Sequence, residues 1–221
     1  MSTRIAKQQP VMRKRPRQAR SRATVETILQ AGARILSDEG WAGFTTNKVA
    51  DLAGVSIGSL YQYFPDKLSL VDAIRRQHLD DCLAVMRQSK AEGLAPVQFV
   101  ANLVQAMIAA HSIYPGLHRV LLDEAPSSDE YRNPNSEFET EYLGYYAEAV
   151  ASCRNRQPGE SDRTAALIIS DAIDGVIHNA ARRGLLGDPI VQSELIRLVS
   201  LYLQDRGEAP DWTTSIRQKD T

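Results

Sequence analysis

The strongest constraint on the fold of this chain is the segment at residues 44–67, FTTNKVADLAGVSIGSLYQYFPDK. It predicts two short helices joined by a tight turn, because Ala50 is small enough for close helix packing and Gly54 suits a left-handed turn. Ser56 is the expected N-cap of the second helix, and Pro65 ends that helix. Either Thr45 or Thr46 can cap the first helix. The segment therefore predicts a helix-turn-helix.

The two predicted helices each carry an apolar face. In the second helix, Ile57, Leu60 and Phe64 recur at helical spacing and are expected to be buried. In the first helix, Val49 and Leu52 are expected to point inward. The segment should therefore pack against further helices through one side only.

The opposite face of the second helix predicts a contact with duplex DNA. Gly58 and Ser59 have short side chains, so the backbone can come close to another surface. Gln62 can recognise adenine through paired hydrogen bonds in the major groove, and the hydroxyls of Tyr61 and Tyr63 can donate to phosphates. This helix is therefore the candidate recognition helix.

The rest of the chain also has helical periodicity, and no segment alternates convincingly as a strand. Gly40 is expected to stop the first helix, which begins near residue 23. Further helices are expected at residues 66–90, from 96, at 117–124, from 136, at 162–183 and at 188–204. The predicted fold class is all-α, with about nine helices.

Charge is distributed unevenly along the chain, although its net value is only −1. Residues 1–22 hold eight Lys or Arg and no Asp or Glu, whereas the part after residue 67 is acidic on balance. A basic N-terminal third indicates a surface for a polyanion, and the basic arm is expected to add phosphate or minor-groove contacts. The alternative is a solvated tail that binds nothing.

We expect four regions from these patterns. Residues 1–20 form a disordered basic arm, 21–66 the helix-turn-helix domain, 67–206 a helical ligand-binding and dimerisation domain, and 207–221 a flexible tail. Cys82 and Cys153 have no CxxC spacing and are expected to be reduced core thiols, in keeping with a cytoplasmic protein. No apolar run is long enough to span a membrane, and no signal peptide is expected.

The segment from Thr45 to Lys67 resembles the DNA-binding domain of the TetR family of bacterial transcription factors. It matches the pattern T-x-x-x-[IV]-A-x-x-A-G-V-S-x-G-[ST]-L-Y-x-[YH]-F-x-x-K, and residues 28–45 continue the likeness. The resemblance implies a homodimer that binds double-stranded operator DNA under the control of a small molecule.

The resemblance also implies which residues face DNA: Thr46, Ser56, Gly58, Ser59, Tyr61, Gln62, Tyr63 and Lys67. Of these, Tyr63 and Lys67 are expected at phosphates, and Ser59, Tyr61 and Gln62 near base edges. A cation at Lys67, in the first turn of a helix, opposes the helix dipole unless a phosphate lies nearby. The alternatives are that Tyr61 is half in the core, that Ser56 only caps, and that Gly58 only permits packing.

Beyond residue 67 the resemblance implies an architecture rather than a motif, with a ligand cavity in the middle helices and a dimer formed through the last two. The candidate ligand residues are Met107, His111, His118, Phe138, Tyr142, Tyr145, Tyr146 and Asn179. The candidate dimer residues are Ile169, Ile173, Val176, Ala180, Leu195, Leu198, Val199 and Tyr202. Each ligand candidate could instead be core or surface, and the dimer stripes could face only their own core.

The sequence gives little support to a metal site or to an enzymatic function. Asp171, Asp174 and His178 share one helix face and could hold a metal ion, but an exposed polar face is favoured, so neither a metal nor a cofactor is expected. The chain lacks GxGxxG, P-loop, HExxH and GxSxG motifs, and its four histidines lie on separate predicted helices, so it is not expected to be an enzyme. A family member without a ligand, architectural or controlled by a protein partner, is the remaining alternative.

Overall fold

The computed structural model describes residues 18–91, 94–126 and 136–204, and all regular secondary structure in these ranges is helical. The predicted all-α class is therefore confirmed, while the basic arm up to residue 17 and the tail from residue 205 lie outside the described residues. The elements are α1 (Ala19–Gly43), α2 (Thr46–Ala53), α3 (Ile57–Tyr63), α4 (Lys67–Ala91), α5 (Pro96–Ile113), α6 (Leu117–Arg119), the π-helical turn η1 (Val120–Glu124), α7 (Glu137–Cys153), α8 (Glu160–Arg182) and α9 (Pro189–Gln204).

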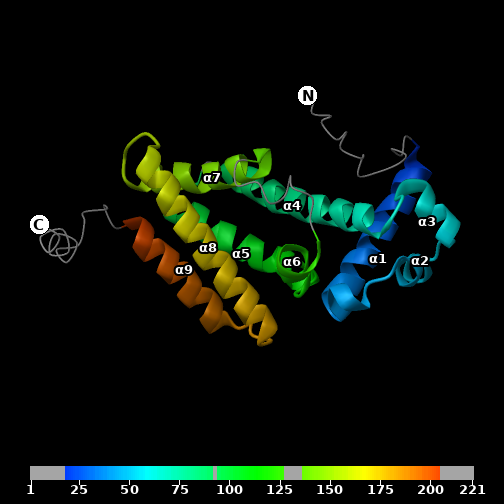
Figure 1. Ribbon diagram of the computed structural model, residues 1–221. Helices are drawn as coiled ribbons and strands as arrows, with labels where there is room; N and C mark the ends of the chain where they lie inside the picture. Colours follow the sequence, from blue (N-terminus) through cyan, green and yellow to red (C-terminus); the bar gives the residue numbers. More distant parts are fainter. Residues whose placement is uncertain (1–17, 92–93, 127–135, 205–221) are drawn as a thin grey trace, which may run out of the picture.

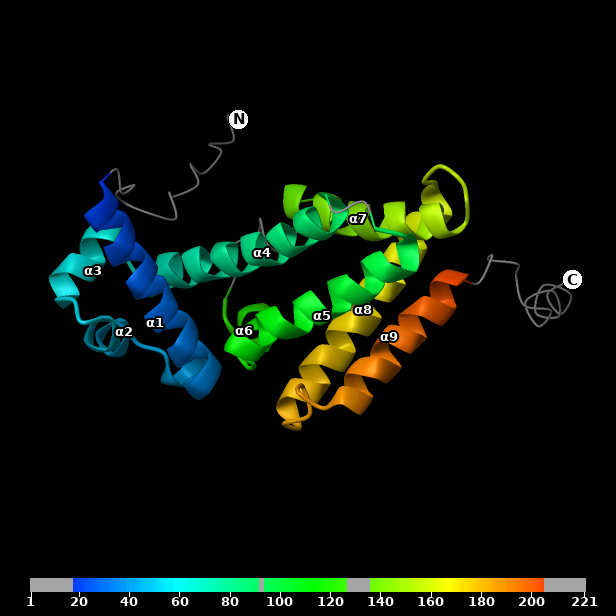
Figure 2. The same cartoon turned by 180° about the vertical axis from the view of Figure 1, so that it is seen from behind.

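The helices gather into two units that lie at opposite ends of an elongated molecule (Figure 1). The first contains α1, α2 and α3, and the second contains α5, α7, α8 and α9. Helix α4 extends from one unit to the other, as the view from behind also shows (Figure 2). A change in the second unit can therefore reach the first through a continuous helix.

Local sequence features form the helix-turn-helix as predicted. The Thr45 hydroxyl accepts from the Lys48 amide at the start of α2 (3.3 Å), and the Ser56 hydroxyl accepts from the Ser59 amide at the start of α3 (3.1 Å). Gly54 ends α2 with a φ of 67°, in the left-handed region where glycine has no steric penalty. Gly40, with a φ of 69°, interrupts α1 at the position predicted for its end, although the helix resumes briefly to Gly43.

The core of the first unit confirms part of the predicted apolar pattern. Leu60 and Phe64 are fully buried, together with Val49. Two predictions are wrong, because Ile57 is 38% exposed and Leu52 is 48% exposed. The first turn of α3, which contains Ile57, lies at the outer end of the unit (Figure 1).

The same core continues past the predicted boundary at residue 66. Leu70 and Ile74 on α4 belong to it, and so do Leu117 on α6 and Val120 and Leu121 on η1. Helix α6 comes close to α1, and at Gly116 an added Cβ would lie 2.5 Å from the Ser37 carbonyl oxygen. The first unit is thus supported by segments that enter it from the second.

Arg75 joins α4 to the end of η1 inside this junction. Its side chain is only 1% exposed, and its guanidinium donates to the Leu121 carbonyl oxygen at 2.8 and 3.1 Å and to the Pro126 carbonyl oxygen at 3.1 Å. It also forms an ion pair with Asp72 at 2.5 Å. A buried cation with these partners holds the two segments in one arrangement.

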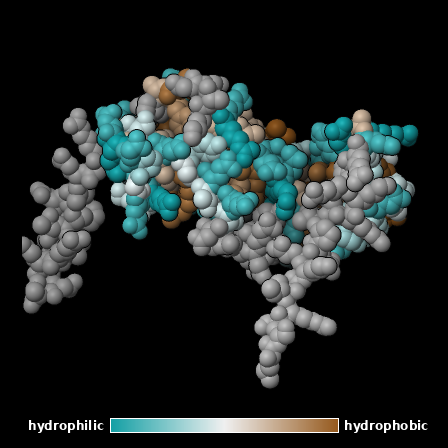
Figure 3. Space-filling view, turned by 90° about the horizontal axis from the view of Figure 1, so that it is seen from above, coloured by the Kyte–Doolittle hydropathy of each residue, from teal (hydrophilic) through white to brown (hydrophobic). Residues whose placement is uncertain are grey.

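The second unit has its own apolar core, built from the second half of α4 and from α5, α7, α8 and α9. Helices α7 and α8 pack closely on each other, and α9 packs on α5. Hydrophilic residues cover much of the face seen in Figure 3, with apolar residues visible between them. In the part of the chain that the structure describes, no helix is long and apolar enough to cross a membrane.

Candidate nucleic-acid interface and interior site

The outward face of α3 presents short and polar groups to solvent. Gly58 and Gln62 are exposed, and Tyr61 is 40% exposed. A Cβ added at Gly58 would meet nothing nearer than the Ser56 hydroxyl, at 3.9 Å, so the backbone is open on this side. This surface can come close to a partner without moving core residues.

Tyr61 is held in place by a neighbour on α2. Its hydroxyl lies 3.1 Å from the Thr46 hydroxyl, which links the two helices on the exposed side. The Ser56 and Ser59 hydroxyls form a second link, at 2.8 Å, within the first turn of α3. Four of the residues predicted to face DNA are thus brought together and oriented by hydrogen bonds.

Tyr63 and Lys67 are placed differently. Tyr63 is only 9% exposed, so most of its ring belongs to the core. The Lys67 ammonium lies 3.5 Å from the centre of the Trp41 ring and 3.4 Å from the Trp41 carbonyl oxygen, to which it donates. Partial burial lowers the pKa of Lys67. Lys67 is therefore at the edge of the surface, anchored on Trp41.

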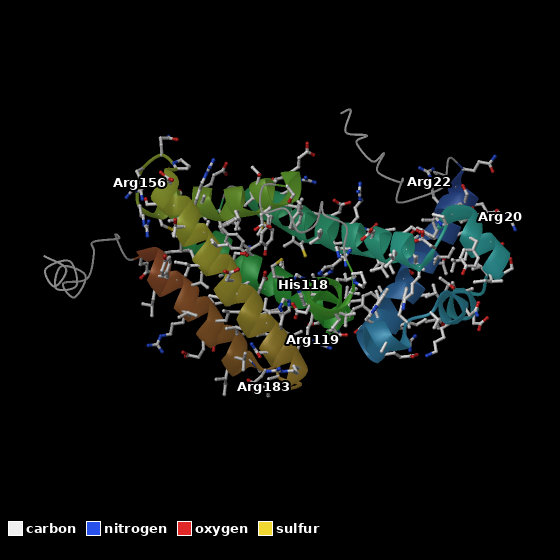
Figure 4. The ribbon with its side chains drawn as sticks, in the orientation of Figure 1. Arg20, Arg22, His118, Arg119, Arg156 and Arg183 are labelled. Carbon is white, nitrogen blue, oxygen red and sulfur yellow. The ribbon has the colours of Figure 1, made fainter. Side chains whose placement is uncertain are left out.

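Basic residues at the start of α1 extend this surface. Arg20 and Arg22 are exposed, and Figure 4 shows them at the end of α1 that lies beside α3. Positive charge and hydrogen-bonding groups therefore occupy the same end of the molecule, in the combination that binds a polyanion.

The second unit gathers most of the predicted ligand residues in its interior. Met107, His111, His118, Tyr142 and Tyr146 are all buried there. Figure 4 shows His118 among α4, α5 and α8.

The other three ligand candidates are nearer the surface. Phe138 is partly buried and stacks on Tyr142, with ring centroids 5.3 Å apart. The Tyr145 hydroxyl donates to Glu141 at 3.1 Å. Asn179 is exposed, and its amide donates to the Gly175 carbonyl oxygen of its own helix, so the fold does not bring it to the interior group.

All four histidines of the chain meet in this interior, although they come from four different helical segments. His118 Nδ1 lies 2.7 Å from His78 Nε2 and 3.3 Å from His111 Nε2. The ring of His178 stacks on that of His118 with centroids 4.2 Å apart. The sequence does not point to His78, and it connects His178 only with Asp171 and Asp174 on the same helix, because spacing along the chain does not show which helices meet.

The environment keeps these rings neutral. Burial, aided by the neighbouring rings, lowers the pKa of His78 to about 3 and that of His178 to about 4. The pKa of His111 and of His118 is also lowered, mainly by burial. At neutral pH each ring therefore carries one hydrogen and one lone pair on its two nitrogens.

A buried carboxyl group lies one helical turn from His178. Burial and the negative charges of Asp171 and Glu139 raise the pKa of Asp174 to about 7, and its Oδ1 atom is buried without a protein partner. Burial raises the pKa of Cys82, and the negative charge of Asp174 raises it further. Asp174 and Cys82 therefore lie in one interior region. Asp171 itself is exposed. Among the described residues, Asp171, Asp174 and His178 do not bring three ligand atoms together, although they share one helix face.

The predicted dimer residues are divided between core and surface. Ile169, Ile173, Ala180, Leu195 and Val199 are buried within the second unit of one chain. Leu198 is exposed, while Val176 and Tyr202 are partly buried. The large apolar residues that do remain exposed on α8 and α9 are Leu167, Ile168, Ile190, Leu198 and Leu201.

Comparison with known proteins identifies relatives of both units. Residues 28–74 match the family model described as "Bacterial regulatory proteins, tetR family", and residues 96–203 match "Tetracyclin repressor-like, C-terminal domain". The repressor KstR2 of Rhodococcus jostii is 36% identical over 89 residues, which cover 38% of this chain and 44% of KstR2. The regulator RutR of Escherichia coli is 32% identical over 102 residues, which cover 46% of this chain and 48% of RutR. The chain thus matches just under half the length of these curated relatives.

Solved structures show the same fold over most of the chain. The fatty acid degradation regulator FadR of Bacillus halodurans aligns with a TM-score of 0.67 at 18% identity, covering 86% of this chain and 97% of that one. A TetR-family regulator of Streptomyces coelicolor aligns with a TM-score of 0.60 at 23% identity, covering 81% and 97%. The two family models together cover most of both units, and they show that the chain belongs to the TetR family of bacterial transcriptional regulators.

Proposed function

We propose that this chain is a transcriptional repressor that binds a palindromic DNA operator as a homodimer and leaves it when a small-molecule effector binds. The observation that carries the proposal is the outward face of α3, where Gly58, Tyr61 and Gln62 are exposed and Leu60 and Phe64 are buried beneath them. One-sided burial of a short helix, next to basic residues, fits insertion into a major groove.

On this proposal the polar residues have separate roles. Gln62 contacts a base edge, while Ser56, Ser59 and Thr46 orient the surface and reach nearby sugar or phosphate groups. Tyr61 remains a base-edge candidate with its hydroxyl held by Thr46. Tyr63 is largely buried, and Lys67 packs on Trp41. Each of these two residues therefore contacts phosphate only through the end of its side chain, the Tyr63 hydroxyl and the Lys67 ammonium.

The exposed apolar residues of α8 and α9 support a dimer. In a single chain, an apolar surface is exposed to water on these helices, formed by Leu167 and Ile168 on α8 and by Leu198 and Leu201 on α9. Removing such a surface from water is favourable. A second copy packed on this surface forms a four-helix interface and places two α3 helices for two half-sites, as a palindrome requires. In that arrangement the buried stripe of Ile169, Ile173 and Val199 supports the interface from within rather than touching the partner.

The interior of the second unit is the proposed effector site. Buried aromatic rings and Met107 supply an apolar lining, while Asp174 supplies a polar group without a protein partner. This composition suits a carbon-rich molecule with one hydrogen-bonding or charged group. The transcriptional regulator FadR of Bacillus subtilis, which has a similar fold, is described in complex with stearoyl-CoA, a molecule with a long carbon chain.

Coupling between the sites follows from the junction. The interior lies against α4, and Arg75 ties α4 to η1, which packs on α1. An effector that binds one arrangement of α4 more tightly shifts the whole molecule toward it. A coupling of about 1–3 kcal/mol is ordinary for such proteins.

The proposal is tested by selecting bound sequences from random duplex DNA with the full-length chain. We expect an inverted repeat with half-sites about one helical turn apart, or a little more, because each subunit reads one half-site. Thermal-shift screening then finds effectors, which raise the melting temperature of the native state. Selection without enrichment at low ionic strength contradicts the proposal, and a selected sequence with no repeat contradicts its dimeric part.

A further inference from the structure

Three imidazole nitrogens converge at one point in the interior. His78, His111 and His118 each offer one ring nitrogen, and these three atoms all lie within 4.8 Å of one another. Two of the contacts run from His118 Nδ1, to His78 Nε2 and to His111 Nε2. At a metal–nitrogen distance of about 2.0–2.1 Å, two ligands of a tetrahedral ion are roughly 3.3 Å apart. The separation between His118 Nδ1 and His111 Nε2, 3.3 Å, matches this value. The separation between His118 Nδ1 and His78 Nε2, 2.7 Å, is shorter, so one of these rings must move outward when an ion binds.

The hydrogen-bond partner of His111 fixes the direction of its lone pair. Its Nδ1 lies 2.7 Å from the Met107 carbonyl oxygen, which can only accept, so Nδ1 carries the hydrogen. In the neutral ring, Nε2 is then unprotonated and points its lone pair toward His118. A second partner of this kind is what orients histidine ligands in metalloproteins.

The convergence is hard to satisfy with hydrogen bonds alone. A single hydrogen on His118 Nδ1, or on His78 Nε2, can serve the short contact between those two atoms. His111 Nε2, which lies 3.3 Å from His118 Nδ1, is then a second acceptor directed at the same point and has no hydrogen of its own to share. A cation accepts all three lone pairs together.

We propose that His78, His111 and His118 bind a divalent first-row transition metal ion of the Zn²⁺ class, and that its binding alters the affinity for DNA. Neutral imidazole is the ligand form, and three nitrogen donors suit Zn²⁺, Cu²⁺, Ni²⁺ and Co²⁺ better than Mg²⁺ or Ca²⁺. His78 is partly exposed, which leaves a route for the ion from solvent. Asp123, which interacts electrostatically with His178, adds negative charge on one side of the group.

The position of the site gives the ion a regulatory role. The three ligands belong to α4, α5 and α6, so one ion joins three segments. Helix α6 packs on α1 of the first unit. On α4, His78 lies three residues after Arg75 and four after Ile74, which belongs to the core of the first unit. This second part of the proposal depends on the proposed DNA-binding function, whereas metal binding itself does not.

Metal binding is measured on the untagged, full-length chain after treatment with a chelator. Titration with Co²⁺ should produce visible ligand-field absorption that saturates at one ion per chain, and Zn²⁺ should displace it. Because the chain has only four histidines, ¹⁵N-histidine NMR resolves each ring, and those of His78, His111 and His118 should shift as Zn²⁺ is added. Absence of saturable binding by both methods overturns the site.

The variants His78→Gln, His111→Gln and His118→Phe each remove one ligand. Each should weaken Zn²⁺ binding by more than about 100-fold, since losing even an outer-shell partner costs about 10–100-fold. Tyr146→Phe is the matched control, because it removes one buried hydroxyl from the same interior and leaves all three nitrogens. Circular dichroism verifies the fold of every variant. If the variants at the buried His111 and His118 unfold, His78→Gln still measures the loss of one ligand, because His78 is partly exposed. Unchanged affinity in folded His78→Gln overturns the site.

The DNA arm uses the sequence obtained by selection, with and without Zn²⁺. Affinity should change at least about fivefold for the wild-type chain and not for His78→Gln. Saturable metal binding with equal DNA affinity in both conditions overturns the regulatory part and leaves the metal site. A chain that binds Zn²⁺ but no DNA contradicts the proposed function instead.

Discussion

The face of α3 and the interior of the second unit hold their polar groups in opposite ways. At α3 the functional groups come from one short segment and are oriented by neighbours such as Thr46 and Ser56. In the interior, His78, His111, His118 and His178 come from four segments far apart in the chain. A local motif can be altered residue by residue, whereas the interior depends on how whole helices pack. A substitution on the DNA face should therefore leave the rest of the fold unchanged. A substitution in the interior should also change the packing of the helices that meet there.

The largest expected effect lies where the two regions meet. Arg75→Ala removes the buried guanidinium and leaves the carbonyl oxygens of Leu121 and Pro126 without this donor. We expect a loss of about 3–5 kcal/mol in the free energy of unfolding, measured with urea. Arg34→Ala, which breaks an exposed ion pair with Asp38 at 3.7 Å, is the control and should change stability by less than about 0.5 kcal/mol. Equal losses in both variants would show that the junction is not a structural link.

Within α3, burial separates two similar apolar residues. Leu60→Ala should cost about 3 kcal/mol, because Leu60 is fully buried and its removal leaves a cavity. Ile57→Ala should cost about 0.5 kcal/mol or less, because Ile57 is exposed at the end of the unit. Thermal unfolding of the two variants compares them directly. A larger loss for Ile57→Ala would mean that the first turn of α3 is covered.

In the interior, Asp174 makes stability depend on pH. Its pKa is about 7 in the folded chain, above the ordinary value of 3.8, so the folded state holds a proton that the unfolded state releases. Stability from this group is therefore present at low pH and is lost as pH rises through 7. Asp174→Asn should stabilise the chain by about 1–3 kcal/mol at pH 8 and by almost nothing near pH 4.

Denaturant unfolding at the two pH values measures this difference. Asp51→Asn is the control, since Asp51 is exposed on α2, and it should change stability by less than about 0.5 kcal/mol at either pH. Stabilisation by Asp174→Asn that is equal at pH 4 and pH 8 would show that the carboxyl group titrates normally.

A smaller effect is expected from the cap of α3. Ser56→Ala removes the hydroxyl that accepts from the Ser59 amide, at a cost of about 1 kcal/mol. Ser56→Asn keeps an accepting oxygen at the cap and should retain most of that stability. Melting temperatures of the two variants give the comparison, and identical losses would assign the effect to something other than capping.

The sequence predicts the local features of the fold well because they depend on nearby residues. Caps at Thr45 and Ser56, the left-handed Gly54 and the buried Leu60 all follow from short spacing, and all are present. The prediction for Ile57 is wrong because periodicity shows which face of a helix is apolar, but not how far along the helix other elements cover that face.

The interior was harder to predict for the same reason. Periodicity marked the apolar faces of α8 and α9 without separating the side that faces the core from the side that faces solvent. Periodicity therefore predicts both Ile173 and Leu198 as dimer residues, although only Leu198 is exposed. The histidine group has no sequence pattern, because its members meet only through the packing of α4, α5, α6 and α8.

The most direct test of DNA binding by α3 is the affinity of Gln62→Ala for the selected duplex and for an unrelated duplex, measured by fluorescence anisotropy at one salt concentration. We predict a loss of about 1–3 kcal/mol on the selected duplex, as expected for one base contact, and almost no change on the unrelated one. Unchanged affinity for both, or an equal loss on both, would contradict base recognition by this helix.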